Sequence, residues 1–210
     1  MEIATLLSEF RAARLLDTEA PFLWSDVELL AYLDQAQMEY FALTGWIIDD
    51  YSPFTTVGIT TGTSSIRRDA SIVRVLDAVL LSTQRSLKLV VGLPIVKNTG
   101  EIHAMAVGQR TGRFVFDAIA AQDDTLRLRV ERAPISTVCS LSDELEVPER
   151  HQRTLFDYME YQAYKKPDND TQDVRRSMAA FAQFEARCTG FKAEISRGRT
   201  PVLVTKYGGY

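Results

Sequence analysis

The chain has 210 residues, of which 46% are hydrophobic and 25% are charged, the proportions of an ordinary globular protein. This length is enough for one well-cored domain, or for one domain with a sizeable insertion. The formal net charge of −4 supplies no general attraction to nucleic acid. No apolar run approaches the roughly 20 residues that cross a bilayer, so we expect no membrane partner.

The ends and the cysteines of the chain bear on where it is made. The N-terminus lacks a basic segment followed by an apolar run, so it does not resemble a secretory signal. Cys139 and Cys188 stand far apart and form no Cys-x-x-Cys motif. This pattern favours two reduced thiols over a disulfide and predicts a protein of intracellular origin.

Two helical patterns occupy the N-terminal part of the chain. A short amphipathic series over residues 3–10 is followed by a break at residues 17–21. A much stronger pattern covers residues 24–44. Ser25 is a favourable N-cap there, and Glu28 stands three residues later, so the two side chains are placed to form a capping box.

The helix predicted over residues 24–44 carries apolar side chains on two sides. One stripe contains Val27, Leu30, Ala31, Met38 and Phe41, and the other contains Leu29, Tyr32, Leu33, Ala36 and Tyr40. Two stripes predict burial on two sides, against the chain's own core and against a neighbouring subunit. We interpret this segment as a subunit-packing helix, whose candidate contact residues are Trp24, Leu29, Tyr32, Leu33 and Tyr40.

The period changes to that of β-strands between residue 51 and about residue 134. Short strands are predicted over residues 55–61, 71–81, 87–91, 104–109, 114–117 and 125–132. We expect the strands at 71–81 and 87–91 to pair through a short polar turn, and residues 110–113 to form the turn of a hairpin. Short strands at this spacing are typical of a small antiparallel sandwich or open barrel.

The helical period returns after Pro148, which suits a first helical turn. A helix is predicted around residues 155–162 and ends at residues 165–167. Acidic residues at 168–170 can then cap a second helix. The final residues, 200–210, fit neither pattern and are short and β-prone, which favours an extended arm over a frayed end.

The chain as a whole is predicted to be an α+β protein. A helical bundle formed by the N- and C-terminal helices is interrupted by a small antiparallel β-sandwich or barrel and followed by an extended C-terminal arm. The expected boundaries are 1–50 and 147–199 for the helical core, 51–146 for the inserted β domain and 200–210 for the arm.

No pattern in the sequence predicts a catalytic site, a metal site or a cofactor. The histidines, His103 and His151, have no second His or Cys at ligand spacing, so we expect structural or surface roles. Phosphate-loop, dinucleotide-binding and nucleophile-elbow motifs do not occur. We therefore predict that the protein is not an enzyme.

The paired acids and bases around residues 123–132 permit alternatives. A magnesium-dependent nuclease would pair Asp123 with a Glu-x-Lys on the next strand, but that strand lacks the lysine. We favour turn acids for Asp123 and Asp124. Arg127 and Arg129 share one strand face, and we favour a solvated face over contact with phosphate or an acidic neighbour.

The order of these features resembles the head-to-tail adaptor proteins of short-tailed bacteriophages, also called tail tubular or connector proteins. The resemblance covers nearly the whole chain. It rests on residues 23–37, the β insertion, residues 126–134, the final helix pair around 161–173 with Phe181 and Phe184, and the ending at 206–209.

The resemblance implies a structural virion protein that is made in the host bacterial cytoplasm and placed in the neck of the virion. It implies a dodecameric ring of this chain that docks on the portal protein, extends the DNA channel and seats the tail or tail-nozzle protein. Double-stranded DNA would pass without sequence-specific binding. The portal-contacting arm would use Pro201, Val202, Leu203, Val204, Lys206, Tyr207 and Tyr210. Another neck or tail-completion protein of a phage is the alternative.

Overall fold

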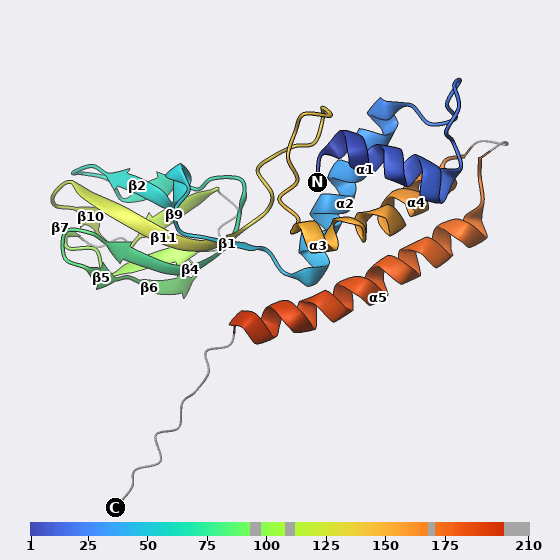
Figure 1. Ribbon diagram of the computed structural model, residues 1–210. Coiled ribbons are helices and arrows are strands. Elements are labelled where there is room, and N and C mark those ends of the chain that lie inside the picture. Colours follow the sequence, from blue (N-terminus) through green and yellow to red (C-terminus); the bar gives the residue numbers. More distant parts are fainter. Residues whose placement is uncertain (93–97, 108–111, 168–170, 200–210) are drawn as a thin grey trace, which may run out of the picture. The chain divides into compact units, whose positions relative to one another are not determined.

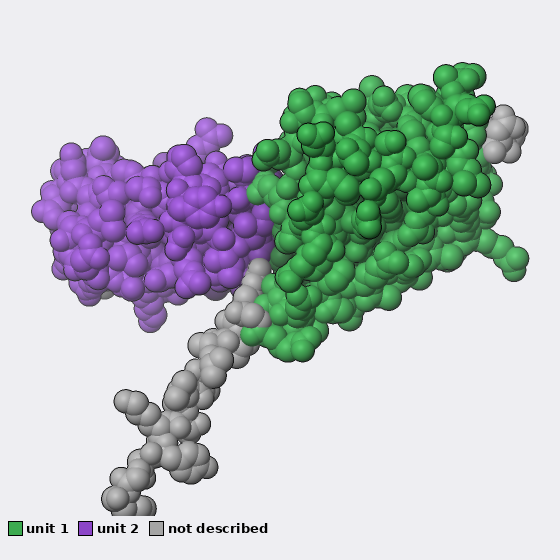
Figure 2. Space-filling model, in the orientation of Figure 1, with its two compact units in different colours: residues 1–45, 136–210 green, residues 46–135 purple. Residues whose placement is uncertain are grey.

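The structure, a computed structural model, describes residues 1–92, 98–107, 112–167 and 171–199. The chain has an α+β architecture, as the sequence predicts. It divides into two compact units, which Figure 2 colours separately. We call them the helical unit and the β unit.

The helical unit contains residues 1–45 and 136–210, and the β unit contains residues 46–135. The β unit is therefore an insertion between the N-terminal and C-terminal parts of the helical unit. The sequence placed the two boundaries after residue 50 and after residue 146. The observed boundaries follow Gly45 and Ile135, so the segment from Ser136 to the next helix belongs to the helical unit.

The helices of the helical unit are shown in Figure 1. They are α1 (Ile3–Phe10), continued by the π-helical turn η1 (Arg11–Leu15), then α2 (Asp26–Thr44), α3 (Glu149–Gln152), α4 (Leu155–Lys165) and α5 (Val174–Arg199). The long helix α5 packs along α4 and α2. Among the described residues, no helix combines the length and the apolar character needed to cross a membrane.

The start of α2 confirms the predicted capping box. The Ser25 hydroxyl accepts a hydrogen bond from the Glu28 backbone N–H at 3.3 Å, and the Glu28 carboxylate accepts one from the Ser25 N–H at 2.9 Å. These two bonds satisfy donors that the first helical turn otherwise leaves free. The helix ends at Gly45, whose φ of 116° suits a residue without a side chain.

Ion pairs fasten three elements of the helical unit together. The fully buried Asp157 of α4 lies 2.8 Å from Arg14 of η1 and 2.9 Å from Arg187 of α5. One turn later, Glu160 contacts Arg14 at 2.9 Å and Arg176 of α5 at 2.7 Å. Burial raises the pKa of Asp157, and the neighbouring arginines oppose that effect. Because a buried charge is costly without its partner, this network favours a single arrangement of η1, α4 and α5.

The β unit contains two main sheets. The first has the order β1 (Ile47–Asp49), β11 (Asp124–Arg132), β4 (Ile72–Leu80), β5 (Arg85–Ser86), and β2 (Thr56–Ile59) also pairs with β11. The second has the order β3 (Ser65–Arg67), β9 (Arg113–Phe116), β8 (Ala104–Val107), β6 (Lys88–Val91). A short pair, β7 (Thr99–Gly100) with β10 (Ile119–Ala120), and the 3₁₀ turn η2 (Pro53–Thr55) complete the unit.

Both sheets contribute to one hydrophobic cluster. Along β11, Leu126, Leu128 and Val130 are buried while Arg127 and Arg129 between them are exposed. This is the alternation that the sequence predicts for a strand with one wet face. Phe114 and Phe116 of β9, in the second sheet, belong to the same cluster. The two sheets therefore share a core.

Of two predicted strand pairings, the structure confirms one and contradicts most of the other. The hairpin prediction is confirmed by the antiparallel pairing of β8 with β9, although residues 108–111 lie outside the described residues. The prediction that residues 71–81 pair with 87–91 is wrong beyond Leu87. The Leu87 N–H donates to the Ala78 carbonyl of β4 at 2.8 Å, and the chain then crosses to the second sheet. There β6 pairs in parallel with β8, so the sheets are not wholly antiparallel.

Candidate functional site

The acids that a nuclease would need are used to hold loops. Asp123 accepts hydrogen bonds from the backbone N–H and the hydroxyl of Thr61, at 2.7 and 2.8 Å. Asp124 accepts from the backbone N–H of Ser82 at 3.1 Å and of Thr125 at 2.7 Å. These donors lower the pKa of Asp123. Within the described ranges, no group of three or more His, Cys, Asp or Glu side chains is placed to hold a metal ion.

His151 is part of the helical core. The Tyr40 hydroxyl lies 2.5 Å from its Nδ1, and its ring stacks on Phe191 with centroids 3.8 Å apart. Burial and the nearby Arg150 lower the pKa of His151, which favours the neutral ring. His103 is half exposed, and its Nε2 lies 4.0 Å from Glu101. These positions agree with the structural and surface roles expected for the two histidines.

A buried arginine fixes the loop between η1 and α2. Arg11 donates to the Asp17 carboxylate at 2.8 Å, to the Trp24 carbonyl at 2.7 Å and to Asp26 at 2.7 Å. Its guanidinium also lies 4.2 Å from the centre of the Phe22 ring. The backbone N–H groups that follow Phe22 donate to the same Asp17 carboxylate. Such a network gives the loop a defined shape.

This fixed loop exposes large apolar side chains. Leu16 is 81% exposed, Leu23 is 57% exposed and Val27, in the first turn of α2, is 77% exposed. Phe22 is also exposed, and Leu16 has a left-handed backbone with φ of 55°. We call residues 16–27 the apolar loop. Exposed apolar side chains on an ordered segment are typical of a contact surface for another protein.

The structure shows where the candidate subunit-packing residues lie. Trp24, Leu29, Leu33 and Tyr40 are at most 2% exposed, because the chain's own helical unit buries them. Tyr32 is half-buried. Val27 and Met38, which belong to the first apolar stripe, are exposed.

A second apolar surface lies at the start of α5. Val174 is 57% exposed and Met178 is 67% exposed, and the two residues are one helical turn apart on the same side. Arg175, between them in sequence, is also exposed. Both this surface and the apolar loop belong to the helical unit, but they differ in charge. The apolar loop carries the acidic residues Glu19 and Asp26.

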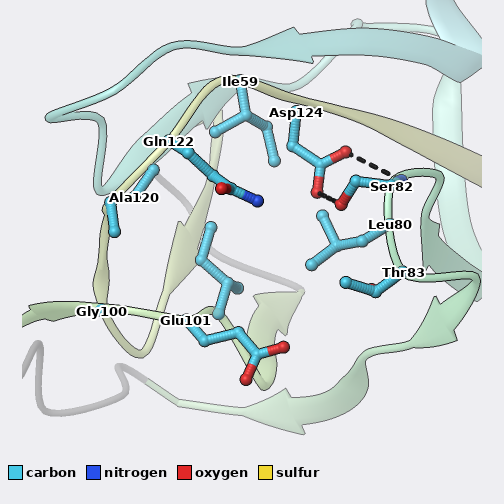
Figure 3. Close-up of a pocket in the computed structure, with 11 residues that line it drawn as sticks. Ile59, Leu80, Ser82, Thr83, Gly100, Glu101, Ala120, Gln122 and Asp124 are labelled. Carbon is cyan, nitrogen blue, oxygen red and sulfur yellow. Dashed lines mark hydrogen bonds between the residues drawn. The ribbon is translucent and has the colours of Figure 1, made fainter.

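The β unit has a pocket of about 240 Å³ at one end of its core, shown in Figure 3. Its floor is apolar and consists of Ile59, Leu80, Ile102 and Ala120. Its rim is polar and includes Ser82, Glu101, Gln122 and Asp124. Figure 3 shows the Gln122 amide extending over the pocket and Glu101 at the opposite edge. Sequence reasoning missed this pocket, because its residues come from four separate segments.

The predicted portal-contacting arm, residues 200–210, lies outside the described residues. The candidate sites among the described residues are the apolar loop, the exposed start of α5 and the pocket of the β unit. They are two exposed apolar surfaces on the helical unit and one pocket in the β unit, features typical of a protein that binds other proteins.

Comparison with known families identifies the family of the chain. Residues 1–205 match the family described as SU10 adaptor protein, and the chain belongs to that family. No curated protein matches the chain. The family comprises phage head-to-tail adaptors, so the protein has a structural role in the virion neck, among neighbours such as the portal and tail proteins. This confirms the resemblance that the sequence suggests.

Proposed function

We propose that this chain forms a closed ring that docks on the portal protein, continues the DNA channel and seats the tail. The observation that carries the proposal is family membership over residues 1–205. A closed ring needs two unlike surfaces on each subunit, one for each neighbour. The helical unit offers such a pair in the apolar loop, where Glu19 is exposed, and the apolar start of α5, where Arg175 is exposed. We propose that these surfaces meet between adjacent copies.

The direct test is native mass spectrometry of the chain alone and mixed with the portal ring of the same phage. The proposal predicts saturable binding of one copy of the chain per portal subunit. A chain that stays monomeric alone is compatible, because the portal can template the ring. Absence of binding at ~50 µM would contradict portal docking and would favour another neck or tail-completion role.

The same assay tests the arm. Removing residues 200–210 should abolish portal binding and leave the circular dichroism and the thermal midpoint of the chain unchanged, because a terminal segment adds little to a core. Normal portal binding by the truncated chain would contradict the assignment of these residues as the portal-contacting arm.

The contact between neighbouring copies is tested separately. Val27→Asp places a charge on the apolar loop and should prevent ring closure on the portal while the monomer stays folded. Val73→Asp is the matched control, because Val73 is an exposed valine of the β unit, 40% exposed, outside both proposed surfaces. Rings that form equally well from both variants would show that the apolar loop is not the subunit contact.

A further inference from the structure

The pocket of the β unit has the size of a single large apolar side chain. Pockets that hold whole drug-like ligands or cofactors usually exceed ~300 Å³, whereas an apolar cavity of ~150 Å³ accommodates benzene. The volume here is about 240 Å³. The size therefore favours one inserted side chain, of the leucine to phenylalanine class, over a drug-sized ligand or a cofactor.

The apolar floor is part of the core and is already held in place. Ile59, Leu80 and Ile102 are at most 4% exposed, and all three belong to the cluster that both sheets share. The floor therefore does not collapse readily when the pocket is empty. A side chain that enters contacts the end of a packed core, which is how a buried anchor residue contributes to a protein–protein interface.

The rim can recognise the backbone of an extended peptide. The Gln122 amide extends over the pocket, and among the described contacts it has no hydrogen-bonding partner within the chain. A side-chain amide offers a donor and an acceptor together, which matches the N–H and C=O of a peptide unit. Gly100 also lines the pocket, and the space where its side chain would stand is open. The rim thus leaves room for a backbone to approach.

The charges at the pocket determine which kind of residue can stand next to the inserted side chain in the peptide. The charged side chains that line it, Glu101 and Asp124, are both acidic. The Asp124 carboxylate is engaged by Ser82 and Thr125, whereas Glu101 is half exposed and meets Arg85 at 3.4 Å. His103 Nε2 lies 4.0 Å from the same Glu101 carboxylate, so Glu101 already attracts basic side chains. An exposed carboxylate attracts a cation and repels phosphate, which favours a basic residue over nucleic acid as the occupant.

We propose that this pocket binds an extended peptide segment of a partner protein, which inserts one large apolar side chain and places a basic residue beside Glu101. The binding site lies wholly within the β unit. It is therefore separate from the surfaces proposed for the ring, and it gives the adaptor a further attachment point for a protein with an exposed segment of this type.

The test uses the full-length chain with methyl labels and three synthetic peptides. The probes are acetylated and amidated Gly-Lys-Leu-Gly, Gly-Lys-Ala-Gly and Gly-Glu-Leu-Gly. We expect the Lys-Leu peptide to shift the methyl signals of Ile59, Leu80 and Ile102 with a Kd of ~1–10 mM, and the other two to bind roughly tenfold more weakly. Absence of saturable shifts at ~50 mM of the Lys-Leu peptide would overturn the proposal.

Two variants locate the effect. Ala121→Trp fills the mouth of the pocket from an exposed position and should abolish the shifts. Ala70→Trp is the matched control at an exposed alanine outside the pocket lining, and it should bind normally. Equal binding by both variants would place the peptide elsewhere and overturn the proposal. Glu101→Lys should reverse the preference toward the Glu-Leu peptide. Because these measurements need neither portal nor ring, they succeed or fail independently of the proposed function.

Discussion

At the scale of single residues, the contacts of Arg11 give it a clear structural role. The Arg11 side chain is 8% exposed and the side chain of its partner Asp17 is 4% exposed. The Arg11 guanidinium also donates to the Trp24 carbonyl and to Asp26. Removing one partner of such a pair leaves an uncompensated buried charge. The apolar loop depends on this contact, because Asp17 also binds the backbone N–H groups of Leu23 and Trp24.

We therefore expect Arg11→Ala to lower the free energy of unfolding by about 3–5 kcal/mol, measured by urea denaturation. Arg153→Ala is the control, because the pair between Arg153 and Glu9 is largely exposed and should contribute less than about 1 kcal/mol. A loss of the same size in both variants would show that the buried network does not fix the loop.

Asp49 of β1 is a second residue of this kind, and it should make the stability of the fold depend on pH. Burial raises the pKa of Asp49, but hydrogen bonds from Ser52 and the ion pair with Arg132 at 2.6 Å outweigh burial and lower it to about 2. Because the pKa of Asp49 is lower in the folded state, its carboxylate stabilises the fold at pH values above the unfolded pKa. This stabilisation is lost as the pH falls toward 2.

The wild type should accordingly lose about 2 kcal/mol more than Asp49→Asn does between pH 4.5 and pH 2. Stability curves of both proteins, from urea denaturation at several pH values, give this difference. Parallel curves for the two proteins would contradict the assigned role of the Asp49 carboxylate.

Sequence reasoning could not find these charged residues, because their partners are distant or lie in irregular segments. Arg11 and Asp17 resemble ordinary surface charges, and burial comes only from the path of the loop. The same limit applies to Trp24, Leu29, Leu33 and Tyr40, which the chain's own helical unit buries. Helical periodicity identifies apolar stripes, but it does not decide whether the chain itself or a neighbour covers each stripe.

At the scale of elements, short sequence patterns predicted the features that depend on neighbouring residues. The capping box at Ser25 and the termination at Gly45 depend on a few neighbouring residues, and both were predictable. The alternation along β11 was predictable for the same reason. The partner of β6 was not, because pairing in parallel with β8 depends on a crossover between sheets that no local pattern encodes.

The capping box also supports a prediction for the whole of α2. Ser25→Ala removes the acceptor for the Glu28 N–H and should lower the free energy of unfolding by about 1 kcal/mol. Ser86→Ala is the control, because it removes an exposed serine hydroxyl from β5 of the β unit. In urea denaturation, a Ser25→Ala variant as stable as wild type would show that the cap does not stabilise α2.

At the scale of the whole molecule, the chain has two separate cores joined by two crossings of the backbone. The hydrophobic cluster that contains Phe116 stabilises the β unit. Aromatic contacts such as Phe10 with Phe156 and the ion pairs of Asp157 stabilise the helical unit. An adaptor benefits from this division. In the two proposals above, surfaces on the helical unit form the ring and the pocket of the β unit binds a different protein.

The division predicts that damage to one core stays within its unit. Phe116→Ala deletes a fully buried ring of the β unit and should destabilise that unit by about 3–5 kcal/mol. Hydrogen exchange should then accelerate by a factor of ~100 or more at the slowest amides of β4 and β11, and remain unchanged at those of α2 and α4. Phe184→Ala, in the helical core, is the matched reciprocal variant and should give the opposite pattern. Acceleration throughout the chain in both variants would mean that the two units unfold as one, and that an insertion in sequence is not an independent unit of stability.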